Sequence, residues 1–205
     1  MSLFPIFVKL QGRLVVVVGG GEIASGKIDG LLRAEARVRV VAPEVHMSFA
    51  EPIRTRRIEW VPRKFEPGDL ANATLAIAAT SAPGVNSAVF LEAESRGILC
   101  NAVDDIENCH FYYGSIVQRG DLQIAISTNG KSPALAHRLR LELEQEFGPE
   151  YETWLEWLGA ARELLRAADG GSESNKRMLH QLASKLMFDR FVKDSQKDPS
   201  HQGVA

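Results

Sequence analysis

A glycine-rich turn is the feature of this sequence best suited to chemistry. Gly19-x-Gly21-x-x-Ala24 directly follows the apolar run 14–18 and opens a stretch with helical periodicity. In such a turn the first glycine allows a tight bend, the second lets the backbone approach a pyrophosphate, and the small third residue lets helix and strand pack closely. The helix amino terminus then stabilises the phosphate charge. The strand-turn-helix setting favours dinucleotide binding over a plain tight turn.

The position that usually holds the ribose-binding acid, about 20 residues after the turn, is occupied by Val41-Ala42-Pro43. Glu44 is the nearest acid, and it either accepts hydrogen bonds from ribose hydroxyls or is simply solvated. No arginine stands beside it to hold a 2′-phosphate. The sequence therefore favours NAD over NADP.

Polar residues follow the later predicted strands, at the edge where open α/β sheets bind their ligands. Asn101 and Asp104 end the fifth predicted strand, and Thr80 follows the fourth, where it could touch the cofactor. An aspartate there can accept a proton from a substrate that loses a hydride. The alternative is a loop aspartate that only turns the chain.

A second polar stretch, residues 127–131, leads into a helix that Ser132 and Pro133 begin. Its hydroxyls, backbone amides, lysine and positive helix end suit anionic carboxylates, although a well-capped turn explains the same residues. The adjacent Cys109 and His110 either bind a metal or occupy core positions; two adjacent residues seldom form a metal site, so we expect none.

Composition narrows the class of partner. With 205 residues the chain is long enough for one main core and a smaller appendage, and 45% apolar with 24% charged residues is ordinary for a globular protein. A net charge of -2 argues against nucleic acid. The amino terminus does not resemble a signal peptide, and the apolar runs are only strand-length. We expect a cytoplasmic protein with reduced cysteines, no membrane span and a small-molecule ligand.

Alternating strands and helices predict an α/β fold with a Rossmann-type, doubly wound parallel sheet. The expected strands are 14–18, 38–41, 58–61, 75–79 and 98–103, with helices at 22–34 and 85–96 and Gly97 as a helix C-cap. The pattern then changes: we expect a hairpin of 115–118 with 122–127, helices at 132–147, 151–168 and 176–192, and a frayed polar tail at 193–205.

These motifs together resemble one family. They are, in chain order, Phe4-Pro5-Ile6-Phe7, the Gly19–Gly21 turn with Ala24 and Lys27, Val41-Ala42-Pro43, Ala78-Ala79-Thr80 with Asn86, Asn101-Ala102-Val103-Asp104-Asp105, and Ile126-Ser127-Thr128-Asn129-Gly130 with Ser132-Pro133. From about residue 3 to 147 the chain resembles the precorrin-2 dehydrogenase family, the amino-terminal module of siroheme synthases. The last helices match only in kind.

The resemblance implies NAD-dependent oxidation of precorrin-2 to sirohydrochlorin by a homodimer, and in some members insertion of ferrous iron. It implies an NAD-binding domain at 1–112, a dimerisation segment at 113–148 and a small helical domain at 149–205. The family's key aspartate falls on Asp104. The complete predicted set is catalytic Asp104; cofactor-binding Gly19, Gly20, Gly21, Glu22, Ile23, Pro43, Glu44, Thr80 and Asn101; and substrate-binding Asn101, Ser127, Thr128 and Lys131.

The chain departs from the family pattern at three places. Gly26 replaces a common arginine, Glu35 replaces a common glycine, and residues 112–115 lack a proline that many members carry. Two alternatives therefore stay open: a non-catalytic NAD-binding redox sensor, in which Asp104 has no role, and an iron chelatase that holds NAD only as a relic. Since no methyltransferase domain follows, we do not expect a trifunctional synthase.

Overall fold

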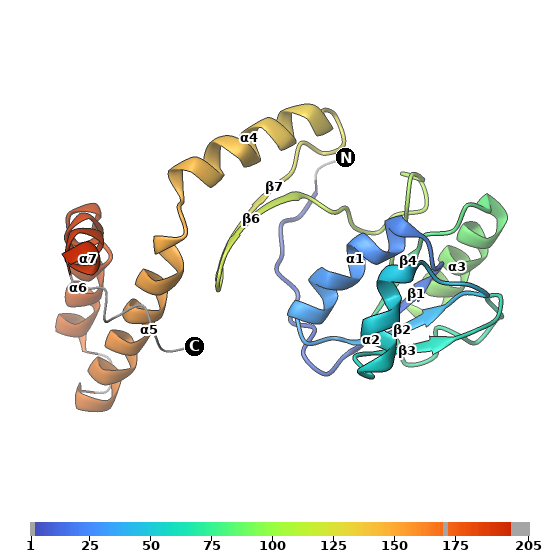
Figure 1. Cartoon of the computed structure of the whole chain (residues 1–205), viewed down its shortest axis with the longest axis horizontal. Coiled ribbons are helices and arrows are strands. Elements are labelled where there is room, and N and C mark those ends of the chain that lie inside the picture. Colours follow the sequence, from blue (N-terminus) through green and yellow to red (C-terminus); the bar gives the residue numbers. More distant parts are fainter. Residues whose placement is uncertain (1–2, 170–171, 198–205) are drawn as a thin grey trace. The chain divides into compact units, whose positions relative to one another are not determined.

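The computed structural model describes residues 3–169 and 172–197, which divide into one compact unit at 3–112 and a second that begins at Tyr113 (Figure 1). The first unit contains β1 (Leu14–Val18), α1 (Glu22–Arg33), β2 (Arg37–Val41), the short 3-10 helix η1 (Met47–Phe49), α2 (Ala50–Arg54), β3 (Ile58–Val61), β4 (Leu75–Ala78), α3 (Pro83–Arg96) and β5 (Leu99–Ala102). The second contains β6 (Ser115–Arg119), β7 (Leu122–Ile126), α4 (Pro133–Glu146), α5 (Glu150–Asp169), α6 (Glu173–Leu182) and α7 (Lys185–Lys197).

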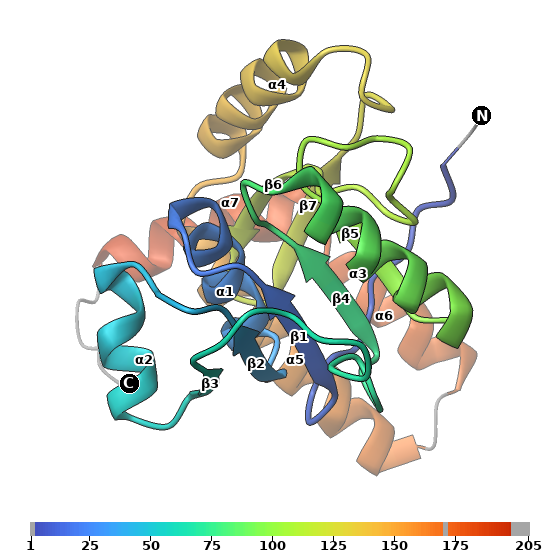
Figure 2. The same ribbon diagram turned by 90° about the vertical axis from the view of Figure 1, so that its right-hand side faces the viewer.

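The first unit is a parallel sheet in the order β3-β2-β1-β4-β5, which confirms the predicted fold class. Val15 of β1 pairs with Val38 of β2 on one side and with Leu75 of β4 on the other. One core lies between the sheet and α1, and the other lies against α3, which runs alongside β4 and β5 (Figure 2). From β1 the chain adds β2 and β3 on one side and then β4 and β5 on the other, so the strand order reverses between β1 and β4. The carboxyl ends of these two parallel strands form the switch point where such sheets bind ligands.

Several predicted helix ends are confirmed. Gly97 follows α3 in the left-handed conformation with φ of 66°, which a glycine adopts without steric cost. Ser132 caps α4 because its Oγ accepts the N–H of Leu135 at 3.2 Å, and Pro133 takes the first helical position. Helix α4 ends just before Gly148 and Pro149.

Three expectations about helices were wrong. No helix was predicted at 47–54, because one short turn carries too little periodicity to stand out. The single helix predicted at 176–192 is two helices, α6 and α7. Ser184 separates them: its Oγ accepts the N–H of Met187 at 3.4 Å and so caps α7. Residues 193–197 continue α7 rather than forming a tail, and 198–205 lie outside the described residues.

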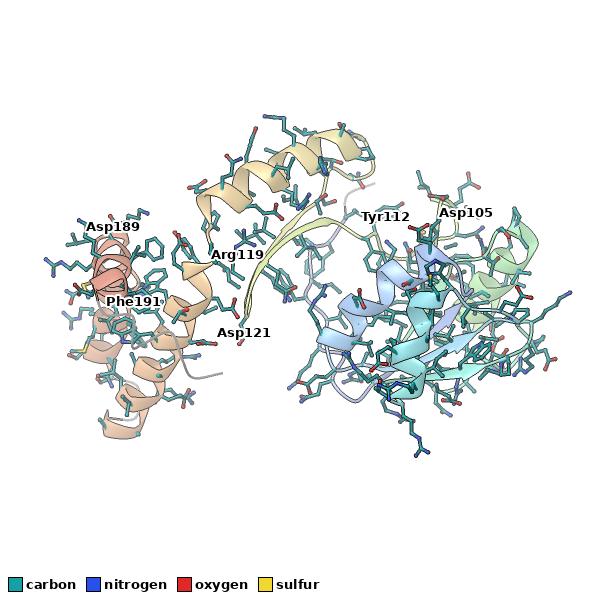
Figure 3. All side chains as sticks on the ribbon, viewed as in Figure 1. Asp105, Tyr112, Arg119, Asp121, Asp189 and Phe191 are labelled. Atoms are coloured by element: carbon teal, nitrogen blue, oxygen red, sulfur yellow. The ribbon has the colours of Figure 1, made fainter. Side chains whose placement is uncertain are left out.

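The second unit begins with a β-hairpin whose strands pair in antiparallel register from Ser115↔Ile126 to Arg119↔Leu122. Arg119, labelled in Figure 3, donates hydrogen bonds to the carbonyl oxygens of Phe147 at 2.9 Å and Glu144 at 3.0 Å. It thereby ties the hairpin to the carbonyl end of α4, where a cation is favoured.

The last helices pack through aromatic rings. Phe188 of α7, which is 5% exposed, stacks on Tyr151 of α5 with ring centroids 4.3 Å apart and meets Trp154 edge-on at 4.9 Å. Aromatic pairs at this spacing stabilise a small helical core beyond the area that they bury.

Candidate functional site

The first two glycines of the turn after β1 are required by the protein's own packing. Gly19 has φ of 118°, and a Cβ on it would overlap the carbonyl oxygen of Ala79. A Cβ on Gly20 would overlap the carbonyl oxygen of Glu44, while the Gly20 carbonyl accepts the N–H of His46 at 2.7 Å. These two residues hold the turn tightly between the segments that follow β4 and β2.

Gly21 is different, because packing within the protein does not require a glycine there. Its φ is an ordinary -79°, and a Cβ would meet no described atom within 4 Å. Gly21 is also the N-cap of α1 and supplies no side-chain acceptor for the first-turn amides. Open space beside uncapped helix amides is what a pyrophosphate needs. The turn therefore fits a dinucleotide, and Ala24, which is fully buried, allows the close helix packing.

The segment after β2 lies against this turn. Ser48 Oγ is 2.7 Å from Ser25 Oγ of α1. Two residues before Ser48, the hydrogen bond from His46 N–H to the Gly20 carbonyl holds the same segment against the turn. Pro43 and Glu44 are exposed beside the glycines. The structure thus brings the predicted Glu44 to the edge of the turn, with its carboxylate in solvent.

Thr80 is held by a residue that we had used only as part of a motif. Its hydroxyl donates to Asn86 Oδ1 at 2.7 Å, and Asn86 Nδ2 donates back to the Thr80 carbonyl at 3.0 Å. Asn86 is one of two buried polar residues in the part of the chain that the structure describes. The pair shapes the turn after β4, so the Thr80 hydroxyl is already engaged within the protein.

Asn101 has a similar internal role. Its Nδ2 donates to the Phe111 carbonyl at 2.8 Å and to Cys109 Sγ at 3.3 Å. The Cys109 thiol in turn donates to the carbonyl oxygens of Ala102 and Asp105, each at 3.1 Å. Asn101 and Cys109 therefore close the loop between β5 and Phe111.

His110 closes the same loop from the other side. Its Nδ1 accepts the N–H of Cys100 at 3.0 Å, and its Nε2 lies 2.6 Å from Glu94 Oε2. The ring also stacks on Phe90, with centroids 4.8 Å apart. Both nitrogens of His110 are thus used by the fold, although His110 is exposed and Cys109 is only half-buried, so neither occupies the buried core position that the sequence suggested.

Asp104 is presented by this closed loop. It is exposed and has φ of 61°, an uncommon conformation for a residue other than glycine. Its neighbour Asp105, labelled in Figure 3, accepts from Asn108 Nδ2 at 2.6 Å and stabilises the loop. Asp104 is thus exposed just beyond the carboxyl end of β5, at the edge of the sheet that carries the glycine turn.

Lys27 of α1 is the site residue that sequence reasoning missed. Burial lowers the pKa of its ammonium, and the Asp104 carboxylate nearby raises that pKa in part. The half-buried amine of Lys27 on α1 and the carboxylate of Asp104 in the loop after β5 therefore lie at the edge of the sheet that carries the glycine turn. The available signal was the position of Lys27, one helical turn after Ile23 on the same side of α1.

The predicted substrate loop belongs to the second unit. Ser127 Oγ accepts the N–H of Asn129 at 3.2 Å, and Thr128 Oγ1 accepts the N–H of Ser132 at 3.2 Å. Lys131 is exposed. The loop is well ordered by its own hydrogen bonds. The other predicted site residues belong to the first unit, together with Lys27; they are the glycine turn, Glu44, Thr80, Asn101 and Asp104.

Within residues 3–169 and 172–197, no group of three or more His, Cys, Asp or Glu side chains is placed to hold a metal ion. A search of the same ranges finds no helix with the length and apolarity to cross a membrane.

Comparison with known families now adds to this geometry. A family model described as "Putative NAD(P)-binding" matches residues 6–115, and one described as "Sirohaem biosynthesis protein central" matches residues 119–146. The first model covers more than half of the chain, and the two meet near the junction of the two units.

Similar proteins point the same way. The siroheme synthase of Actinobacillus pleuropneumoniae serotype 3 is 37% identical over 196 residues, and that of Methylobacillus flagellatus is 46% identical over 144 residues. These matches cover 96% and 70% of this chain but only 40% and 31% of the relatives, so the chain spans about two-fifths or less of their length. A solved structure titled "SirC, precorrin-2 dehydrogenase" superposes with a TM-score of 0.77 at 26% identity, covering 96% of this chain and all of that one. The predicted family resemblance is confirmed.

Proposed function

This chain belongs to the NAD(P)-binding family whose model spans residues 6–115, and on that premise we propose that it oxidises precorrin-2 to sirohydrochlorin, with NAD taking up the hydride. The observation that carries the proposal is Gly21. Its side-chain space is open at the uncapped start of α1, on the same sheet edge as Asp104. The similarity to a solved precorrin-2 dehydrogenase supports the choice of substrate.

In this proposal the main-chain amides of residues 21–23 bind the pyrophosphate, and Glu44 accepts hydrogen bonds from the ribose hydroxyls. Bound NAD supplies a hydride acceptor. The exposed carboxylate of Asp104 accepts or relays the proton that the substrate releases. Lys27 sits beside it as a cation suited to a substrate carboxylate or to the ionised aspartate.

NAD is proposed rather than NADP because of the residues beside the turn. Segment 42–48, which packs against the glycines, contributes the acid Glu44 and contains no arginine or lysine. A carboxylate there favours a free 2′-hydroxyl and repels a 2′-phosphate.

The second unit supports two further parts of the proposal. We assign Ser127, Thr128 and Lys131 to the substrate's carboxylates, and Asn101 to the substrate and the cofactor. We also propose a homodimer built by the hairpin, because Ile116 remains 47% exposed on it and the neighbouring α4 exposes Leu135 and Leu141 by 40% and 42%. We further propose three domains, at residues 1–112, 113–148 and 149–205.

We also propose a cytoplasmic location. Both cysteines are free thiols, as a reducing compartment would keep them.

The test is to incubate the purified chain with enzymatically made precorrin-2 and NAD, with and without ferrous iron, while following NADH absorbance and the tetrapyrrole spectrum. We expect NADH to form in step with sirohydrochlorin in the iron-free reaction. A chain that binds NAD but forms no NADH would support the sensor alternative. In a separate reaction the chain is given preformed sirohydrochlorin and ferrous iron. Iron insertion there, together with no NADH formation from precorrin-2, would support the chelatase alternative.

A further inference from the structure

A hollow of about 410 Å³ lies at the opposite edge of the sheet from the glycine turn. It is lined by residues at the amino ends of β1 and β2 and by the loop before β4, namely Gly12, Arg13, Leu14, Arg37, Arg39, Ala71, Asn72 and Thr74. Its volume falls within the range of small-molecule sites, roughly 300–1,000 Å³. Because the strands are parallel and five residues long, this edge is about 16 Å from the cofactor edge.

The sequence of β2 is unusual for a strand inside a parallel sheet. Such strands are covered on both faces and are normally apolar throughout, as β1 is. In β2, Val38 and Val40 enter the core beside α1, but Arg37 and Arg39 alternate with them and face the other side. Arginines at these positions open the second face of the sheet and line the hollow.

The positive charge in the hollow exceeds the negative charge around it. Arg37 is exposed, and among the described residues its guanidinium has no ion pair or hydrogen bond. Within the described part of the chain, Arg13 donates from Nε alone, to the Lys9 carbonyl at 3.1 Å, which leaves its two terminal amino groups for another acceptor.

Two of the three nearby acids are already ion-paired; the third, Glu35, accepts from the neutral Gln11 amide at 2.8 Å and has no cationic partner among the described residues. Glu59 of β3 pairs with Arg39 at 3.0 Å. Asp69, in the loop that closes the hollow, accepts from both terminal nitrogens of Arg63 at 2.6 and 2.8 Å, and this pairing lowers its pKa. Two guanidinium groups therefore remain to attract an anion, with the Asn72 amide and the Thr74 hydroxyl as neutral donors at the wall.

We propose that this hollow binds a small phosphate-bearing anion, such as pyrophosphate or the phosphates of a nucleotide, at a site separate from the cofactor turn. Arginine forks hold phosphate oxygens in pairs, and two uncommitted guanidinium groups match an anion with two or more charges. The proposal does not depend on the dehydrogenase activity.

Inorganic pyrophosphate is the probe, titrated into the ¹⁵N-labelled full chain without NAD, because NAD carries a pyrophosphate of its own and would compete for the hollow. We expect saturable shifts of the amide signals of residues 12–14, 37–39 and 71–74. Arg13→Ala with Arg37→Ala should weaken binding about tenfold or more, since each loses a charge-assisted hydrogen bond. Arg37→Lys should retain part of the affinity.

Arg54→Ala is the matched control, because Arg54 is an exposed arginine that pairs with Glu51 within its own helix. Its binding should equal that of the unmodified chain. Shifts confined to residues 19–23, equal binding by the double variant, or no saturation at millimolar pyrophosphate would each overturn the proposal. A parallel titration with ADP identifies the recognised group: tighter binding than pyrophosphate indicates a nucleotide, and equal affinity indicates the phosphates alone.

Discussion

The sheet of the first unit and the hairpin-helix segment of the second differ in how completely they bury their apolar residues. In β1 the four valines are at most 1% exposed, and two cores cover both faces of the sheet. Between residues 113 and 146 only Val117 and Ala136 are buried, while Ile116, Leu135 and Leu141 stay open to solvent. A two-stranded hairpin is barely stable alone. The sheet of the first unit is thus covered on both faces, whereas the hairpin segment has the surface of half an interface.

The largest expected effect concerns Gly21, where a side chain would meet no described atom within 4 Å. Gly21→Asp should abolish NAD binding, because bulk and negative charge enter the pyrophosphate space, while the melting temperature stays close to that of the parent. Gly20→Ala should behave oppositely, since its Cβ would strike the Glu44 carbonyl and destabilise the fold. Calorimetric titration and thermal unfolding measure the two effects. Retained NAD affinity in Gly21→Asp would remove the basis for the cofactor placement.

Asp104 provides the next test within the first unit. Asp104→Asn should slow turnover by a factor of about 10²–10⁴ and leave the Kd for NAD unchanged, as expected for a proton acceptor. Glu107→Gln, another exposed acid in the same loop, is the control and should turn over normally. Steady-state rates of NADH formation decide, and normal turnover by Asp104→Asn would exclude the role.

The hairpin segment is tested by its oligomeric state. Ile116→Glu should weaken a dimer by roughly tenfold or more, because a charge replaces an apolar side chain at a buried interface. Gln181→Glu adds the same charge at an exposed polar position of α6, outside the hairpin and α4, and is the matched control. Sedimentation equilibrium gives both dissociation constants. A parent chain that is monomeric at micromolar concentration would contradict the interface.

The alkylation rates of the two cysteines test how tightly the core of the first unit is packed. Cys100 is fully buried, and burial raises the pKa of its thiol to about 12, so almost no thiolate is present at pH 8. Alkylation by iodoacetamide at pH 8 should therefore be much slower at Cys100 than at the half-buried Cys109. Mass spectrometry of timed samples measures both rates. Equal rates would mean that the first unit opens far more readily than its packing implies.

The smallest effect is expected at Glu35, which has φ of 54° where the family commonly has glycine. Glu35→Gly should raise the free energy of unfolding by about 0.5–1 kcal/mol, because only glycine adopts this conformation without strain. The loss of the exposed hydrogen bond from Gln11 offsets part of the gain. Ala34→Gly, at a φ of -79°, should lower the same free energy in urea unfolding. A destabilised Glu35→Gly would show that the strain is absent.

The sequence was sufficient wherever local chemistry decides the structure. The β1 valines, the glycine turn, the Gly97 cap and the Ser132 cap each depend on neighbours along the chain, and they were predicted correctly. The roles of the predicted site residues stay predictions. Those that belong to the first unit do lie at the carboxyl ends of its strands.

What the sequence could not supply were contacts between distant segments. Asn86 and Asn101 hold their turns through buried hydrogen bonds, and Lys27 meets Asp104 only because α1 and the loop after β5 share an edge. The break at Ser184 was missed because apolar periodicity continues through it. Such features depend on tertiary packing, which overrides local propensity.

A crystal structure of the chain with NAD tests the central claim most directly. We predict that the pyrophosphate lies against the main-chain amides of residues 21–23, with the ribose next to Glu44 and the nicotinamide on the side of Asp104. NAD bound elsewhere, or a side chain filling the space beside Gly21, would contradict the account.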